Sequence, residues 1–292
     1  MILGGCSTVP LTTLLPSDGS PQMLRELMGR ENKIVQISPE TKLHKPALLL
    51  LHGATEDPGE MIDIIRQSKE THDVFLYSYD FHMRAEKVAA ALVDEMRRLK
   101  SENAISTNLT VVTFSYSAII FRAAVVLTDD KTVFDGASLI QLVPTSGGSF
   151  LARGMGIASG LVAFASKPSA ASYPFGKFAK RLWGAEGHRK FFDVIAPERM
   201  ISILAEGDTH SLAKIKDDKV RQRYYNGLGT NVTMIPSNTG VTHDYFPNHF
   251  LVLARLKNVL ETGKYAALDA GEVPEKVALH LEKTPAAVEQ VR

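Results

Sequence analysis

The chain has 292 residues, of which 45% are hydrophobic and 22% charged, the balance of an ordinary globular protein. Its formal net charge of +1 and the lack of a basic stripe argue against a nucleic-acid partner. The single cysteine, Cys6, excludes an internal disulfide framework and a cysteine-rich metal site. No run of 18 apolar residues occurs, so the sequence predicts no membrane-spanning helix.

Alternating strand and helix patterns begin after a Ser-, Thr- and Pro-rich start. We expect a tether and a short entry helix over residues 1–30. Continuous apolar runs bounded by Pro, Gly or polar residues are typical of strands buried on both faces of a parallel sheet. Such runs predict strands at residues 33–38, 46–51, 73–80, 108–114, 135–143, 200–204 and 231–235. Helical spacing of apolar residues predicts helices at residues 85–100, 118–127 and 248–261.

This alternation predicts one α/β domain over residues 31–265, with a mostly parallel central sheet flanked by helices. The pattern stops between residues 150 and 197, where Gly, Ala and aromatic residues are frequent. We expect this stretch to be a cap or lid over the site, and the alternative is a helical insertion packed on the sheet. Residues 266–292 are predicted to form a polar tail.

A candidate nucleophile lies where the strand at 108–114 meets the next helix. A strand-to-helix turn exposes a hydroxyl at the edge of the sheet, and the following backbone N–H can face a developing oxyanion. The segment Ser115-Tyr116-Ser117-Ala118-Ile119 resembles the G-x-S-x-G nucleophile elbow of the α/β-hydrolase family. In this frame Ser117 is the nucleophile, and Ile119 departs from the small residue that close packing requires. The alternative is a buried structural serine.

The remaining parts of that resemblance follow in the family's order. His52-Gly53-Ala54 resembles the oxyanion loop, which implies that Ala54 and Ala118 supply the oxyanion N–H groups. The strand ending Glu206-Gly207-Asp208 implies Asp208 as the acid, with Glu206 second. The loop after the last predicted strand implies His243 as the base, with His249 as the alternative.

The resemblance implies a serine hydrolase with the α/β-hydrolase fold that cleaves a carboxylic ester through a Ser-His-Asp triad and an acyl-enzyme. The expected substrate is a small-molecule or lipid ester, and neither a metal nor an organic cofactor is implied. The alternative is a catalytically inactive protein of the same fold that binds a lipid or a partner protein. The sequence does not identify the substrate, the acyl-chain length or the oligomeric state.

A second resemblance concerns the N-terminus. Leu3-Gly4-Gly5-Cys6 resembles the bacterial lipobox, in which the cysteine is lipidated after signal cleavage. It implies a lipoprotein of the bacterial cell envelope, attached to the membrane through Cys6. The alternative is an ordinary exposed thiol on a cytoplasmic protein.

Overall fold

The computed structural model describes residues 32–37, 45–53, 61–80, 83–145, 177–205, 227–229, 231–236, 239–241, 243 and 245–265. Its strands are β1 (Lys33–Gln36), β2 (Ala47–Leu51), β3 (Asp73–Ser78), β4 (Leu109–Phe114), β5 (Ser138–Leu142), β6 (Met200–Ala205) and β7 (Val232–Ile235). Its α-helices are α2 (Ile62–Ser68), α3 (Ala85–Ser101), α4 (Ser117–Leu127), α7 (Lys177–Trp183), α8 (Ala185–Phe192) and α10 (Phe250–Thr262). Short 3₁₀ turns lie at Lys131–Val133, Pro197–Arg199 and Phe246–Asn248.

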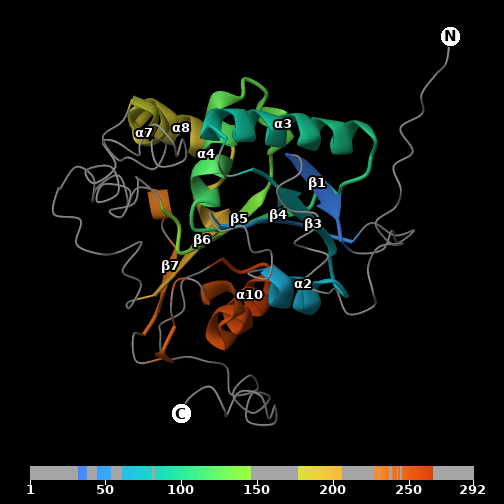
Figure 1. Ribbon diagram of the computed structural model, residues 1–292, viewed down its shortest axis with the longest axis vertical. Helices are drawn as coiled ribbons and strands as arrows, with labels where there is room; N and C mark the ends of the chain where they lie inside the picture. Colours follow the sequence, from blue (N-terminus) through green and yellow to red (C-terminus); the bar gives the residue numbers. More distant parts are fainter. Residues whose placement is uncertain are drawn as a thin grey trace.

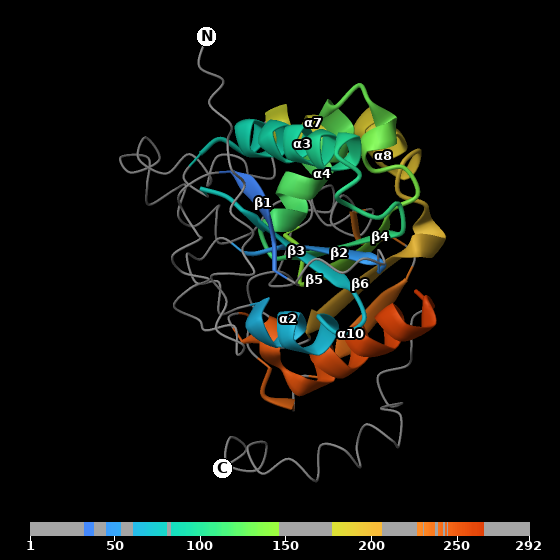
Figure 2. The ribbon, with the colours of Figure 1, turned by 90° about the vertical axis from the view of Figure 1, so that its right-hand side faces the viewer.

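The described strands form one seven-stranded sheet between two helical layers (Figure 1). The strand order is β1-β3-β2-β4-β5-β6-β7. Strand β1 is antiparallel to β3, and all other neighbours are parallel. Helices α3, α4, α7 and α8 cover one face, and α2 and α10 cover the other, as a view turned by 90° also shows (Figure 2). Parallel strands place their carboxyl ends at one edge, where the following loops meet.

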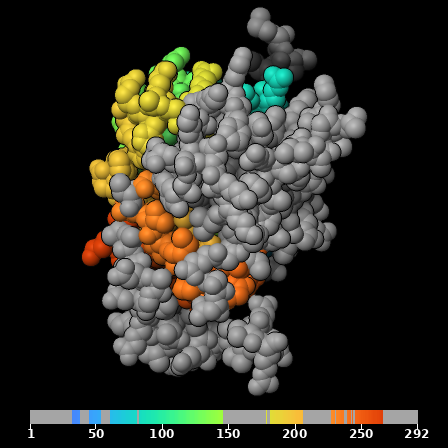
Figure 3. All heavy atoms as spheres, turned by 90° about the vertical axis from the view of Figure 1, so that its left-hand side faces the viewer, coloured from blue at the N-terminus to red at the C-terminus, as the bar shows by residue number. Residues whose placement is uncertain are grey.

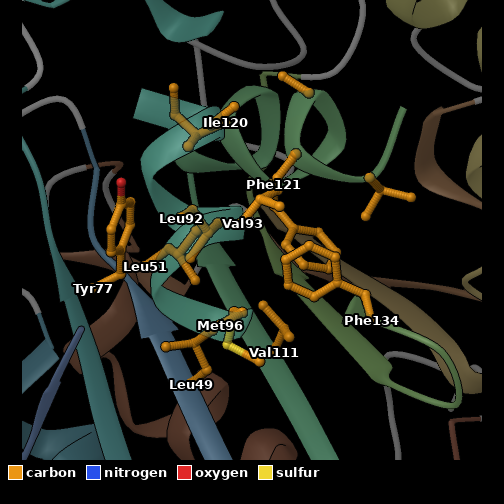
Figure 4. Close-up of a cluster of buried hydrophobic side chains, with 14 of the residues drawn as sticks. Leu49, Leu51, Tyr77, Leu92, Val93, Met96, Val111, Ile120, Phe121 and Phe134 are labelled. Atoms are coloured by element: carbon orange, nitrogen blue, oxygen red, sulfur yellow. The ribbon is translucent and has the colours of Figure 1, made fainter. Parts of the chain in front are cut away.

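Burial on both faces explains why the central strands have continuous apolar sequences. Every residue of β2 and β4 is buried. Because successive strand side chains point to opposite faces, Leu49 and Leu51 pack under α3 and α4, whereas Leu48 and Leu50 join the cluster on the α2–α10 side. Figure 4 shows the first of these clusters, with Met96 of α3 and Phe121 of α4 over the sheet.

The predicted strands and helices that fall on described residues are confirmed, with ends shifted by a few residues, and the entry helix expected within residues 1–30 lies outside the described residues. Helix α2 was not expected, although Ile62, Ile64 and Ile65 make one of its faces apolar and buried. Residues 177–197 of the expected cap belong to the helical layer, because α7 and α8 pack against α4. Residues 150–176 lie outside the described residues, so a cap formed by them stays a prediction.

The α7–α8 packing depends on a glycine. Gly187 is buried on α8, where a Cβ would overlap the backbone carbonyl of Arg181 and lie 2.5 Å from the carbonyl oxygen of Leu182. Both oxygens belong to backbone, which cannot rotate away as a flexible side chain does. The close approach of α8 to the end of α7 therefore requires a residue without a Cβ.

Gly187→Ala is predicted to lower the free energy of unfolding by about 1–3 kcal/mol, the usual cost of overpacking. This sign is opposite to helix propensity, which favours Ala over Gly by roughly 1 kcal/mol. Urea unfolding measures the change. Glu186→Ala, on the same helix with its side chain 76% exposed, is the control. A Gly187→Ala protein as stable as this control would contradict the packing argument.

Candidate active site

The turn between β4 and α4 has a strained residue at its first position. Strand β4 ends at Phe114 and α4 begins at Ser117. Ser115 therefore starts the turn, and its φ of 52° is left-handed, which is uncommon for a residue with a Cβ. Its N–H donates to the carbonyl oxygen of Leu142 at 2.9 Å. This backbone shape is the one expected of a nucleophile elbow.

The neighbouring strand end holds the carbonyl of the same residue. The Thr145 N–H and hydroxyl both donate to the carbonyl oxygen of Ser115, at 3.2 and 3.3 Å. Thr145 is buried and follows β5 by only a few residues. Thr145 was not among the predicted site residues. Its position after Pro144, at the end of the strand next to β4, is the signal that could have found it.

The structure brings His243 to the hydroxyl of Ser115. The Nε2 atom of His243 lies 2.8 Å from Ser115 Oγ, in a hydrogen bond that joins residues 128 positions apart in the chain. The imidazole is half-buried and lies 5.3 Å from the ring of Phe114, measured between centroids. An imidazole at this distance can accept the hydroxyl proton, which turns a weak nucleophile into an effective one.

The segment that carries His243 lies between β7 and α10. Figure 3 shows the face beyond β7, where the described residues from 227 to about 250 (orange), β7 among them, lie below those of α7 and α8 (yellow). The histidine predicted as base is thus in the loop after the last strand, as expected. The serine it contacts is not the one that was expected.

The prediction that the Ser117 hydroxyl is the accessible nucleophile is wrong. Its side chain is fully buried, with 0% of its surface exposed, compared with 7% for Ser115. Its hydroxyl donates to the carbonyl oxygen of Leu51 at 2.8 Å and accepts from the N–H of Phe114 at 2.9 Å. The oxygen therefore joins the end of β2 to the end of β4 and has no room to attack a substrate.

The expected oxyanion donor on this helix is also corrected. The Ala118 N–H donates to the carbonyl oxygen of Ser115 at 3.3 Å, inside the first turn of α4. The residue after the serine that contacts His243 is Tyr116, so its N–H replaces that of Ala118 as the candidate donor.

The sequence also fits a second frame of the motif. Reading G-x-S-x-G as Thr113-Phe114-Ser115-Tyr116-Ser117 places a small residue at the second glycine position, whereas the frame centred on Ser117 places Ile119 there. Ile119 is fully buried in the core between α4 and the sheet. The requirement for a small residue at a close strand–helix contact thus favours Ser115.

The surroundings of His249, the alternative base, indicate a structural role. It is buried at the N-terminus of α10, and its Nε2 lies 3.3 Å from the carbonyl oxygen of Thr239. Burial lowers the pKa of this imidazole, so that its neutral form is favoured. None of its contacts within the described residues is with Ser115 or Ser117.

Several predicted positions lie outside the described residues: Cys6, Ala54, Glu206 and Asp208. The two residues before Ala54, His52 and Gly53, are described and buried after β2. Within the described part of the chain, no cluster of three or more His, Cys, Asp or Glu side chains could hold a metal ion. In the same part, no helix is long and apolar enough to cross a bilayer.

No protein-family model matches the chain, and no curated protein matches it in sequence. Solved structures match it in shape. Aspergillus fumigatus lipase B superposes with a TM-score of 0.56 at 14% identity over 88% of this chain. The match spans 61% of that lipase, less than two thirds of its length.

Two further structures agree with this result. Est1E from Butyrivibrio proteoclasticus superposes with a TM-score of 0.51 at 12% identity, over 78% of this chain and 93% of that one. Esterase B from Lactobacillus rhamnosis gives a TM-score of 0.51 at 11% identity, over 77% and 76%. Together with the strand order and the helical layers, these likenesses show that the chain has the α/β-hydrolase fold.

Proposed function

We propose that the protein is a serine hydrolase that cleaves a carboxylic ester, with Ser115 as nucleophile and His243 as base. The observation that carries this proposal is the 2.8 Å hydrogen bond between His243 Nε2 and Ser115 Oγ. It joins a base and a hydroxyl at the tight turn after β4, at the carboxyl edge of the sheet, where a nucleophile elbow is expected.

The reaction would follow from this geometry in two stages. Ser115 Oγ attacks the ester carbonyl while His243 Nε2 takes its proton, and the tetrahedral intermediate expels the alcohol, which receives that proton. Water then gives a proton to His243 and attacks the acyl-enzyme, and Ser115 recovers its proton as the acid leaves. The backbone N–H groups of Tyr116 and Ala54 are the proposed oxyanion donors.

The third member of the triad is proposed from the sequence. A carboxylate that accepts a hydrogen bond from the second imidazole nitrogen of His243 would fix its tautomer and stabilise the imidazolium. Asp208, which follows β6, is the proposed acid, and Glu206 is the alternative. Both come after the strand that precedes β7 in the sheet, so the order of the triad along the chain is Ser115, Asp208, His243.

The corrected frame removes the main feature that favoured an inactive binding protein. Ile119 seemed to break the motif, but in the frame centred on Ser115 it is a core residue of α4. The two positions that usually hold glycine carry Thr113 and Ser117, and both side chains fit there fully buried.

The fold also occurs in an esterase and a lipase, which supports ester hydrolysis as the reaction class. A lipid ester and attachment to a bacterial membrane through Cys6 stay predictions from the sequence.

Replacing each serine of the turn separates the nucleophile from the structural hydroxyl. Ser115→Ala is expected to lose p-nitrophenyl acetate turnover by at least about 10⁴-fold and all labelling by a fluorophosphonate. Ser117→Ala should keep both labelling and measurable turnover. It should cost about 1–3 kcal/mol of stability, because the carbonyl of Leu51 and the N–H of Phe114 lose a buried partner. Labelling that persists in Ser115→Ala would sink the assignment.

The two histidines near β7 and α10 are distinguished in the same way. His243→Ala should reduce kcat by several orders of magnitude, because no other described side chain is hydrogen-bonded to Ser115 Oγ. His249→Ala should retain turnover with lower thermal stability, since its ring is buried at the start of α10. The reverse pattern of kcat values would transfer the role of base to His249.

The acid is tested by isosteric amides. Asp208→Asn is expected to lower kcat by about 10⁴-fold, the loss that follows when the base is held in the wrong tautomer. Glu206→Gln is the matched control and should leave kcat near the wild-type value. Equal kcat values for wild type and Asp208→Asn, with a loss in Glu206→Gln, would reassign the acid.

A further inference from the structure

The carbonyl of Ser115 belongs to the same peptide group as the N–H of Tyr116, the proposed oxyanion donor of this turn. Its oxygen receives three hydrogen bonds from described residues. The Thr145 N–H and hydroxyl donate at 3.2 and 3.3 Å, and the Ala118 N–H donates at 3.3 Å. Ala118 lies in the first turn of α4, whereas Thr145 follows the neighbouring strand β5. The two donors of Thr145 therefore tie this peptide group to the next strand of the sheet.

This peptide group moves as one rigid plane. The bond between Ser115 and Tyr116 is trans, and its partial double-bond character keeps the C=O and the N–H coplanar and on opposite sides. At its other end, the ring of Tyr116 is buried in the core under α3 and α4. Contacts that fix the Ser115 oxygen therefore also fix the direction of the Tyr116 N–H, which lies on the side of the peptide away from Thr145.

The fold does not use the N–H of Tyr116. Among the described residues, no acceptor receives it, although the N–H groups of Ser115 and Ala118 both have acceptors. Tyr116 is the N-cap of α4, and the first N–H groups of a helix have no partner within it. This N–H is thus free to bind a negatively charged oxygen, which the positive end of the helix dipole also favours.

Donors on the carbonyl oxygen also strengthen the N–H of the same peptide. Hydrogen bonds in a chain polarise one another, so a C=O that receives donors makes its own N–H a better donor. Thr145 supplies two of the three donors on the Ser115 oxygen. Its contacts therefore act on both the direction and the strength of the bond that the Tyr116 N–H can form.

We infer that Thr145 is a positioning residue for the oxyanion hole. Its N–H and hydroxyl hold the peptide group between Ser115 and Tyr116, so that the Tyr116 N–H keeps the direction in which it meets the developing oxyanion. This inference rests on the proposed ester hydrolysis at Ser115. Its effect is expected on kcat, because the carbonyl oxygen of the substrate gains its charge only on the way to the tetrahedral intermediate.

The chain offers a matched control for removing the Thr145 hydroxyl. Thr110, near the start of β4, is buried like Thr145, and its hydroxyl lies 3.3 Å from that of Tyr265. Thr145→Val and Thr110→Val thus remove the same group from a hydrogen bond of the same length, and Val keeps the shape of the side chain. Of these two hydroxyls, only that of Thr145 is bonded to the turn that carries Ser115. Both variants are expected to lower the Tm by similar amounts.

The test measures kcat and KM for p-nitrophenyl acetate and the affinity for phenylboronic acid, whose adduct with a serine mimics the tetrahedral intermediate. Thr145→Val keeps the N–H of residue 145, so kcat should fall by about 5- to 50-fold, less than the roughly 10²–10³-fold loss of an entire oxyanion donor. KM should change little, and the affinity for phenylboronic acid should fall by a similar factor. Thr145→Ser, which keeps the hydroxyl, should restore most of both values, and Thr110→Val should stay near wild type. A merely structural role would not produce this split between kcat and KM.

The remaining outcomes separate the inference from the proposed function. If wild type is active and Thr145→Val matches Thr110→Val in kcat and in boronic acid affinity, the positioning role is wrong and the proposed function stands. If folded wild type neither hydrolyses esters nor reacts with a fluorophosphonate, both fail. Should Thr145→Val not fold, Thr145→Ala is compared with Thr145→Ser. A lower kcat in the Ala variant supports the inference, and equal kcat values overturn it.

Discussion

The left-handed backbone of Ser115 is the constraint on which the rest of the site depends. A residue with a Cβ in such a region costs on the order of 1–3 kcal/mol and persists only where its surroundings hold it. Here the holding groups are backbone and hydroxyl donors and acceptors from the end of β5, which bind both the N–H and the C=O of Ser115. With both peptide groups fixed, the side chain is directed toward His243.

A second left-handed residue lies on the strand that supplies these groups. Val143 directly follows β5 and has a φ of 38°, which is a genuine outlier for a β-branched residue. Its N–H donates to the carbonyl oxygen of Ile203 in β6 at 2.9 Å. The bend at Val143 leads the chain to Thr145 and so to the carbonyl of Ser115. The shape of the turn after β4 is thus determined by three neighbouring strands.

The strands of the sheet could be predicted from the sequence because both faces of the sheet are buried. A strand such as Leu48-Leu49-Leu50-Leu51 must be apolar at every position, and it reads as one run. The position of the proposed nucleophile has no comparable pattern in the sequence. Ser115 and Ser117 differ in backbone φ and in their partners, and these depend on β2, β5 and the loop before α10. Only the size limit at the second glycine position was visible locally, and it favoured Ser115.

Nor does any motif mark Tyr79 and His52 as a pair, although their rings stack with 4.1 Å between centroids. The Tyr79 hydroxyl donates to the carbonyl of His52, and the strain at Ser115 and Val143 opposes stability. Tyr79 and Val143 also belong to the two buried clusters of the core. These residues follow adjacent strands of the sheet. Backbone strain of this kind clusters at functional sites, and at Ser115 it supports the proposed hydrolase over a protein that uses the fold only to bind.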